Sequence, residues 1–600
     1  MEDLIDRSQV QNALGLKGTF GRFAANVLYR VLGMVPINRK WHQLGRFKGP
    51  EFSSEILKAL DVGYDLDSAQ LDNIPADGGF ITISNHHYGA ADGLILNAIV
   101  GARRPDFKIL TTFFLSCIPS LKDCFIPVDN FAKGGARSVS GIRQALDQIA
   151  QGRPLGLFPA GEVATWQKKG QRTAVGGKRV VEDKPWPDNI IRLVQKSGLP
   201  VVPVYFDGGN SRLFHILGRI HPMLRTLRLV KELVNKKGKT IKVRFGKAIS
   251  AEEIAAMDFT ALGGYLRSRC YALEAQCALR SEKAAAVVQA PLDAPVEPAL
   301  VREQMEAVQD KMIFSNGDYR GYLLDASDAP DAMRELYRLR EETFRAIGEG
   351  TGKTSDTDQY DNYYKHLVLW NVPNGELVGS YRYGYASDII ESGGLDALYT
   401  ASLVRYGPAA PGILASGMEL GRSFISTKYQ REVLPLKLLL TGLAVAAAKH
   451  PKVESYFGTV SVSDAIPDFY KSLLVSFIER DFLMPEGDGF AVAPKPFKKD
   501  FLRVNPDDLL GAIPKGNIDA LDRLILTMSD GKCRLPVLFR KYFNCGAKAA
   551  CFNVDPLFGN SLDALIVLPL KAFPLNMFRS VTRPLDAGLQ AEIYSHFYSR

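Results

Sequence analysis

Short apolar runs alternate with segments of helical periodicity over the first 250 residues, and this alternation restricts the fold more than any other feature of the sequence. GGFITIS (78–84) and GLPVVPVYF (198–206) are typical of strands. SVSGIRQALDQIAQG (138–152) and DNIIRLVQKSG (188–198) repeat apolar residues at helical spacing and end at glycine. Strands that alternate with helices indicate an α/β domain.

A second α/β pattern follows a change in composition at residues 280–304, which are rich in Ala, Pro and Glu and poor in aromatic residues. Beyond it come a helix (328–347), two strands, and a further strand (417–426) that leads into a strongly apolar helix (434–450). Six hundred residues exceed what one hydrophobic core usually serves. We therefore expect an N-terminal domain over 1–280, a linker over 281–310 and a C-terminal domain over 311–600.

The composition indicates a globular protein with an acidic partner. Hydrophobic residues make up 46% of the chain, and the net charge is +9. Basic residues crowd the segment from Arg212 to Lys247, where a solvated face and a phospholipid-facing surface are equally consistent with the pattern. Seven cysteines without metal-ligand spacing predict reduced thiols, no zinc site and a cytoplasmic protein.

No signal peptide or spanning helix is expected. The first ten residues are polar and acidic, and no window reaches about 18 uninterrupted apolar residues. The segment from Thr19 to Ile37 carries Arg22 and Arg30 at amphipathic spacing. We favour a helix packed on its own domain over one that lies on a membrane.

The stretch SNHHYGAADG (84–93) places two histidines close to an aspartate, directly after a strand. A histidine whose ring is fixed by a carboxylate can act as a general base, and the small residues around it leave room for a substrate chain. Five residues separate His86 from Asp92, and four separate His87 from Asp92. A purely structural hydrogen bond in a loop is the alternative for either pair.

Together with CFIPVD (124–129), LGLFPAGEVATW (155–166) and LPVVPVYFDGG (199–209), this stretch resembles the four ordered blocks of the PlsC-type glycerolipid acyltransferases, over about residues 60–250. The resemblance implies that a His/Asp pair deprotonates an acceptor hydroxyl, which attacks an acyl thioester. It makes His86 and Asp92 the catalytic pair, because His86 directly follows Asn85 as in the aminolipid branch, and it leaves His87 as the alternative base. It also implies substrate-binding roles for a further set of residues: Asn85, Gly89, Phe158, Pro159, Gly161 and Glu162.

The third block departs from the pattern of the glycerol-phosphate enzymes. Ala160 stands where those enzymes have glutamate, and Glu162 follows two places later. This departure places lysophosphatidic acid in doubt as the acceptor.

From Ala332 onward the chain resembles the GNAT-like N-acyltransferases that make ornithine lipids, through LYRLREETF (336–344), DNYYKHLVL (361–369), ELVGSYRYG (376–384), MELGRSFIS (418–426) and YFGTVSVS (456–463). Such an enzyme needs no nucleophilic side chain, since the substrate amine attacks the thioester. Glu419 is the candidate that positions or deprotonates the amine, and a strand-end ion pair with Arg422 is its alternative. Arg340 and Arg382 are candidate forks for a carboxylate or phosphate, although Arg340 also suits a helix surface.

Other parts of this pattern bear on the acceptor and the donor. Asp361 and Arg422 are expected at the substrate by the same resemblance, and His366 fits a structural histidine better than a base. The segment before the apolar helix, TKYQREVLPLKLLL (427–440), has no glycine-rich turn for a pyrophosphate. Acyl carrier protein is therefore expected as donor in preference to acyl-CoA.

Two acyltransferase patterns in tandem resemble the bifunctional ornithine lipid synthases of bacteria. The resemblance implies N-acylation of ornithine or a similar amino acid with a 3-hydroxyacyl group, and then O-acylation of the new hydroxyl of the lyso-ornithine lipid. It implies a peripheral protein at the anionic cytoplasmic face of the inner membrane, with no metal, no organic cofactor and no nucleic acid. The alternatives are a lysophospholipid (1-acylglycerol-3-phosphate) acyltransferase with an accessory GNAT domain, and a non-enzymatic lipid-surface adaptor.

Overall fold

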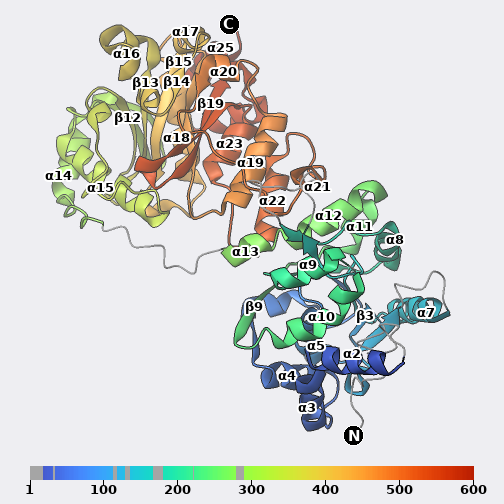
Figure 1. The fold of residues 1–600 in the computed structure, drawn as a ribbon. Helices are drawn as coiled ribbons and strands as arrows, with labels where there is room; N and C mark the ends of the chain where they lie inside the picture. Colours follow the sequence, from blue (N-terminus) through green and yellow to red (C-terminus); the bar gives the residue numbers. More distant parts are fainter. Residues whose placement is uncertain are drawn as a thin grey trace. The chain divides into compact units, whose positions relative to one another are not determined.

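The computed structural model describes residues 18–31, 34–112, 118–128, 136–166, 180–220, 222–278 and 289–599. It divides into two compact units (Figure 1). The first comprises Met1–Leu279, Phe501–Pro514 and Arg523–Cys533, and the second comprises Arg280–Asp500, Lys515–Asp522 and Arg534–Arg600. Two segments that we expected in the C-terminal domain thus belong to the first unit. Asp129 of the second block lies outside the described residues, as do residues 1–17 and the start of the predicted linker at 280–288.

A seven-stranded sheet forms the centre of the first unit. Its strands, in spatial order, are β1 (Val62–Leu66), β9 (Lys239–Phe245), β8 (Val201–Phe206), β2 (Ile81–Ser84), β5 (Leu155–Leu157), β3 (Lys108–Thr112) and β4 (Phe125–Val128). All neighbours pair in parallel except β8 and β9, which are antiparallel. The predicted α/β class is confirmed, although β1 (VGYDL) was not among the expected strands.

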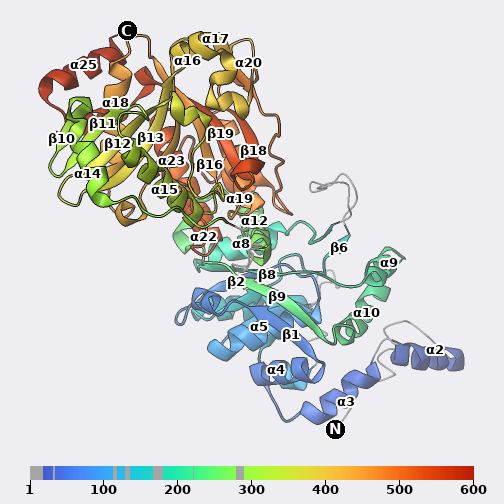
Figure 2. The same cartoon turned by 90° about the vertical axis from the view of Figure 1, so that its left-hand side faces the viewer.

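Helices cover both faces of this sheet (Figure 2). On one side lie α4 (Gly49–Ala59) and α5 (Ala90–Arg103), and on the other lie α8 (Asp188–Ser197) and α12 (Phe259–Tyr271). The central strands are therefore buried on both faces, as the fully buried β2 and β8 show. The other described helices of residues 18–278 are α2 (Gly18–Val31), α3 (Met34–Leu44), α7 (Ala136–Ala150), α9 (Arg212–Ile220), α10 (Pro222–Val234), α11 (Ala251–Ala256) and α13 (Glu274–Ala278).

The segment expected as one amphipathic helix from Thr19 contains two helices, α2 and the first part of α3, and α3 packs against α4 and α10. Among the residues described, no helix is both long and apolar enough to cross a membrane.

The second unit has an eight-stranded sheet. Its strands, in spatial order, are β10 (Met312–Asn316), β11 (Tyr319–Leu324), β12 (Lys365–Asn371), β13 (Glu376–Tyr385), β15 (Gly417–Ile425), β16 (Ser455–Val462), β19 (Ser561–Pro569) and β18 (Lys548–Asp555). Neighbours are antiparallel, except that β15 and β16 are parallel.

Helix α18 (Leu434–Ala448) packs on β11, β12 and β13, whereas α15 (Pro330–Ala346) packs on β13 and β15. Helices α24 (Leu575–Thr582) and α25 (Ala587–Tyr598) pack against α18. The sequence therefore predicted the central helix and its strands correctly. The linker prediction over 281–310 is wrong at its end, because Pro298–Ala307 forms helix α14, whose Val301 and Met305 lie in the core of this unit. These two apolar side chains share one helix face, since they are four residues apart.

Candidate active sites

His86 and Asp92 form a hydrogen-bonded pair at the end of β2. The loop after β2 leads into α5, and Asp92 lies in the first turn of that helix. Asp92 Oδ2 is 3.0 Å from His86 Nδ1 and also accepts from the backbone N–H groups of Tyr88, at 2.8 Å, and Gly89, at 3.0 Å. Asp92 is fully buried, whereas the His86 side chain is 18% exposed. The carboxylate is thus fixed and the imidazole is accessible, which suits a general base.

His87 lies elsewhere. Its ring is fully buried between Tyr205 and Tyr271, with ring centroids 5.9 and 6.0 Å away. Burial lowers the pKa of His87 to about 3, so the ring is neutral at physiological pH. Of the two adjacent histidines, only His86 is paired with Asp92 in the structure, with five residues between them.

Asn85 ties the catalytic loop to the sheet. Its amide nitrogen donates to the carbonyl oxygen of Phe206 at 2.9 Å, and its amide oxygen accepts from the N–H of Phe206 at 2.8 Å. Both ends of this buried amide are therefore bonded to β8, and Asn85 positions the loop instead of facing a substrate. Gly89 has φ +83°, and a side chain there would meet Leu229 Cδ2 at 2.9 Å, so only glycine fits at the start of α5.

The third sequence block lies against His86. The Phe158 ring is 4.4 Å from the imidazole, and the N–H of Ala164 donates to the carbonyl oxygen of His86 at 2.7 Å. Pro159 is buried, and Gly161 turns the chain with φ +68°. Glu162 forms ion pairs with Lys184 and with Arg225, the latter at 2.7 Å, and these cations lower the pKa of Glu162 although burial acts in the opposite direction.

Several residues of the basic segment have partners within the first unit. Arg225 pairs with Glu162, Arg228 pairs with Glu232 at 3.1 Å, and Lys236 donates to the carbonyl oxygen of Gly209 at 2.8 Å. These contacts place a cationic helix, α10, beside the His86 loop. The segment is therefore not simply a solvated basic face.

In the second unit, the ladder between β15 and β16 ends at Glu419. The two strands pair only from Gly417 and Ser455 to Glu419 and Phe457. A side chain at Gly458 would lie 2.2 Å from the carbonyl oxygen of Leu420, so the two backbones are still in close contact at the residues that follow the last pair. The facing edges of β15 and β16 therefore have no ladder pairing beyond Glu419 and Phe457, although both strands continue.

Glu419 is buried, and no cationic side chain in the described part of the chain forms an ion pair with it. One oxygen accepts from the hydroxyl of Tyr364 and the other from the N–H of Thr400 at 2.7 Å. Burial raises the pKa of Glu419, which makes its carboxylate a stronger base than an exposed one. The expected alternative, an ion pair with Arg422, is not formed in the structure. Sequence reasoning did not select either residue: Tyr364 lies within DNYYKHLVL (361–369) but was not singled out there, and Thr400 lies in none of the stretches considered.

A buried cluster of three arginines and three aspartates lies next to Glu419. Its members are Arg340, Arg382, Arg422, Asp356, Asp358 and Asp361. Asp361 accepts from both Arg340 and Arg382, at 2.9 and 3.1 Å, and their charges hold its pKa well below the usual range although burial opposes this. These aspartates therefore do not form a solvated acidic run, because their carboxylates neutralise buried guanidinium groups.

The three arginines differ in how many of their N–H groups have a hydrogen-bond partner. Arg340 is 1% exposed and donates from Nε, Nη1 and Nη2 to Asp356 and Asp361, so it is neither a surface charge nor a free fork. Within the described part of the chain, Nη2 of Arg382 and both Nε and Nη1 of Arg422 have no hydrogen-bond partner. These groups can receive an anion such as a carboxylate. His366 is fully buried and its pKa is lowered to about 4 by burial, which fits a structural histidine.

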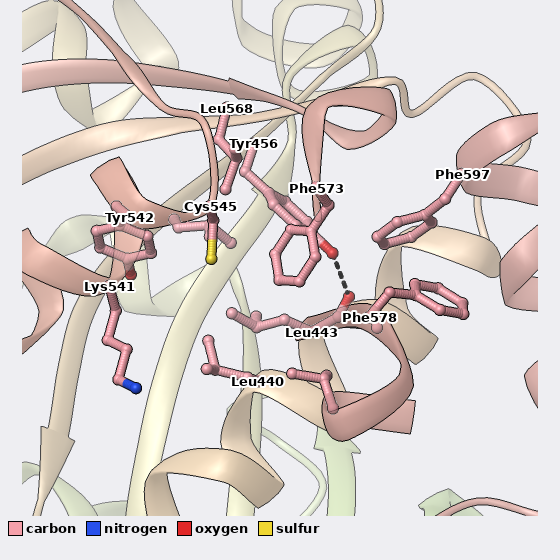
Figure 3. Close-up of a pocket in the computed structure, with 13 residues that line it drawn as sticks. Leu440, Leu443, Tyr456, Lys541, Tyr542, Cys545, Leu568, Phe573, Phe578 and Phe597 are labelled. Carbon is pink, nitrogen blue, oxygen red and sulfur yellow. Dashed lines mark hydrogen bonds between the residues drawn. The ribbon is translucent and has the colours of Figure 1, made fainter. Parts of the chain in front are cut away.

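An apolar cavity lies on the α18 side of the sheet in the second unit (Figure 3). Leu420, which follows Glu419 on β15, lines it together with residues of α18, α23 (Val537–Asn544), α24 and α25. Figure 3 shows the rings of Phe573, Phe578 and Phe597 on one side of this cavity and Lys541 on the other. Sequence reasoning missed it, because its lining comes from strands and helices up to 177 residues apart.

Comparison with known proteins assigns a class to each part of the chain. Residues 8–278 match the family described as "Acyltransferase", and residues 339–440 match the family described as "Acetyltransferase (GNAT) domain". The chain thus contains an acyltransferase domain followed by a GNAT domain.

Two relatives from Bacteroides thetaiotaomicron are similar to parts of the chain. A glycine N(alpha)-acyltransferase is 30% identical over 31% of this chain, and a lyso-glycine lipid O-acyltransferase is 26% identical over 38% of it. The matched regions span 59% and 81% of these relatives, so the chain spans about three fifths of the length of the N-acyltransferase. The crystal structure of the 1-acyl-sn-glycerophosphate acyltransferase PlsC from Thermotoga maritima aligns with a TM-score of 0.25 and 16% identity, over 39% of this chain and 80% of that one.

Proposed function

We propose that this chain makes an aminolipid by two successive acyl transfers. The GNAT domain transfers a 3-hydroxyacyl group to the amino group of ornithine or a similar amino acid, and the acyltransferase domain then transfers a second acyl group to the new 3-hydroxyl. The order follows from chemistry, since the acceptor hydroxyl arrives only with the first acyl group. The observation that carries the proposal is the His86–Asp92 pair beside an accessible loop, in a chain whose other unit holds a buried carboxylate where the ladder between β15 and β16 ends.

In the O-acyl transfer, His86 acts as general base. Its Nδ1–H donates to Asp92, so Nε2 is free to accept the proton of the hydroxyl as the oxygen attacks the thioester carbonyl. The imidazolium then returns the proton to the departing thiolate. Asp92 stabilises the imidazolium and stays ionised throughout. No covalent acyl-enzyme, metal or organic cofactor takes part.

In the N-acyl transfer, Glu419 accepts a proton from the substrate ammonium so that the amine can attack the thioester carbonyl. The raised pKa of this carboxyl favours that proton transfer. The C–S bond then breaks, and the departing thiolate takes the second proton that the nitrogen loses. The amino acid carboxylate binds the N–H groups of Arg382 and Arg422 that have no hydrogen-bond partner, and it competes with Asp356, whose Oδ2 lies 3.4 Å from Nη1 of Arg422. Both guanidinium carbons lie over the ring of Tyr399, at 5.0 and 5.5 Å, and the N–H of the next residue, Thr400, donates to Glu419. Arg340 holds the aspartates of this cluster in place and does not touch the substrate.

The thioester donor is acyl carrier protein in preference to acyl-CoA. The segment before α18 lacks a glycine-rich turn for the pyrophosphate of coenzyme A, and a basic protein suits an acidic carrier.

The protein docks on the anionic cytoplasmic face of the inner membrane, where its product accumulates. Phe23 and Val27 on α2 and Leu213 and Ile216 on α9 are exposed apolar side chains of the first unit. Arg30 and Arg212 on the same two helices are exposed cations that suit anionic headgroups.

Two amino acids are candidates for the acceptor that becomes the head group of the lipid. Ornithine follows from the resemblance of the whole chain to ornithine lipid synthases, whereas the names of the relatives favour glycine as a second candidate. Both acceptors provide the α-carboxylate that Arg382 and Arg422 can bind. A lysophospholipid acyltransferase with an accessory GNAT domain is a different outcome, which the same experiment separates.

The test is expression in a bacterial host that lacks aminolipids, with labelled ornithine or labelled glycine in the medium. Thin-layer chromatography should show a ninhydrin-positive, phosphate-free lipid that carries one of the labels. Unchanged lipids, or a change confined to phosphatidic acid, would contradict the proposal.

A further inference from the structure

The backbone of His86 is held on both sides by one hairpin. Its carbonyl oxygen accepts from the N–H of Ala164 at 2.7 Å, and its N–H donates to Oδ1 of Asp183 at 3.1 Å. Ala164 directly precedes β6 (Thr165–Trp166) and Asp183 directly follows β7 (Val181–Glu182), and these two strands pair with each other. The peptide that carries the proposed base is therefore fixed by both strands of one ribbon.

The carboxylate of Asp183 is itself fixed, and it forms no ion pair with a lysine or arginine of the described residues. Asp183 is 2% exposed, and its Oδ2 accepts from Trp186 Nε1 at 3.2 Å. Its backbone N–H donates to the Tyr271 hydroxyl at 2.9 Å. Arg267 stacks on the Tyr271 ring but forms its ion pair with Glu182. Within the described residues no lysine or arginine forms an ion pair with Asp183. Its two carboxylate hydrogen bonds come from neutral donors, and the charge of Arg267 acts on it only from a greater distance.

A buried carboxyl group without an ion pair costs stability, which calls for a functional reason. We infer that Asp183 is a second positioning carboxylate for His86: it fixes the backbone of the base while Asp92 fixes the ring, and its charge stabilises the imidazolium formed during O-acyl transfer. This inference rests on the proposed O-acylation and adds to it a residue outside all four sequence blocks.

The charge of Asp183 gives the inference a pH dependence. Burial raises the pKa of Asp183 to about 6, so the group is ionised only above that pH. An ionised neighbour makes His86 a stronger base, because it favours the imidazolium. The titratable or charged groups that face this pair from the surrounding elements are Asp92, His87, Glu182, Arg267, Cys270 and Tyr271.

The substitution Asp183→Asn alone is not a clean test. The amide nitrogen of asparagine would point its hydrogens at either the N–H of His86 or the indole N–H of Trp186. The change Trp186→Phe removes the second of these donors. In the double variant the asparagine oxygen can then accept from the N–H of His86, while its NH2 group faces no other donor. The matched comparison is therefore Trp186→Phe against Trp186→Phe with Asp183→Asn, which differ in the charge.

Two measurements decide the inference. The first is the pH profile of O-acylation with purified lyso-lipid and an acyl thioester. We expect the acidic limb of kcat/KM to move to lower pH by about half a pH unit or more in the double variant, and kcat on the plateau to fall roughly tenfold, with KM nearly unchanged. If the double variant has the same acidic limb of kcat/KM and the same kcat as Trp186→Phe, the inference is overturned and Asp183 is a merely structural residue.

The second measurement needs no turnover. In protein with isotope-labelled histidine, the His86 signal is assigned through the His86→Ala variant and titrated by NMR. Loss of the Asp183 charge should lower the pKa of His86 by about the same amount as the kinetic limb moves. If the wild-type chain acylates no lyso-lipid, the proposed function fails, and this titration still supports or refutes the contact between Asp183 and His86.

Discussion

The substitution Asp92→Asn tests the O-acyl site most sharply, because it removes one charge and little else. Oδ2 of Asp92 accepts from His86 Nδ1 and from two backbone N–H groups, while Oδ1 is buried and has no hydrogen-bond partner in the described part of the chain. An asparagine can place its amide oxygen where Oδ2 lies and its NH2 group where Oδ1 lies. The loop should therefore keep its shape, and His86 should keep its tautomer.

The magnitude follows from the lost attraction between the carboxylate and the imidazolium. At a charge separation of about 4 Å and an effective dielectric constant of about 20, this attraction amounts to roughly 4 kcal/mol. The His86 side chain is 18% exposed, so solvent screening reduces the effect to about 3 kcal/mol. Since about 1.4 kcal/mol corresponds to a factor of ten in rate, kcat for O-acylation should fall roughly a hundredfold.

The assay follows both acyl transfers in one reaction with purified chain. Asp92→Asn should accumulate the mono-acylated lipid at the wild-type rate, because Glu419 and the second unit are unchanged. A variant that keeps more than about a tenth of the O-acylation rate would refute the role given to Asp92. Circular dichroism and thermal unfolding check that the fold is retained.

The remaining predictions concern four single residues and one pH effect. In the purified His86→Ala variant, O-acylation should be abolished and N-acylation kept. The purified His87→Ala variant should keep O-acylation, because His86 is unchanged, but should unfold at a lower temperature through a loss of about 2–3 kcal/mol of packing. Glu419→Gln should lower both products more than tenfold in the same assay, and added synthetic lyso-lipid should restore the diacylated product. Arg340→Ala should cost about 3–5 kcal/mol in denaturant unfolding, because it leaves buried aspartates unpaired. Between about pH 4 and 6 the folded protein keeps the proton that Asp183 has lost in the unfolded chain, so stability should fall by up to about 3 kcal/mol as the pH rises, and this slope should disappear in Asp183→Asn.

Local sequence patterns predicted the fold class and the candidate base, because both depend on short stretches. The apolar run at 81–84 forms β2, and the small residues after it form the loop that carries His86. The choice of His86 over His87 depended on the preceding asparagine, whose amide fixes the loop on β8. Adjacent side chains on that loop then take different directions, so only one of them reaches Asp92.

The sequence could not predict partners that meet only after the chain has folded. Arg340 has the spacing of a helix-surface charge, yet it is buried because Asp356 and Asp361, which come later in the chain, bind its guanidinium group. Asp183 belongs to no motif and reaches His86 through a hairpin almost a hundred residues further along the chain. The segments Phe501–Pro514 and Arg523–Cys533 lie beyond the predicted boundary, and only tertiary packing assigns them to the first unit.

The most direct test of two linked acyl transfers is a reconstitution with the purified chain. The reaction contains a 3-hydroxyacyl thioester on acyl carrier protein, a second acyl thioester, and either ornithine or glycine, and mass spectrometry follows the lipids over time. We predict that a mono-acylated amino acid appears first and is then converted to the diacylated lipid. Acylation of lysophosphatidic acid by a chain that forms no acylated amino acid would contradict the account.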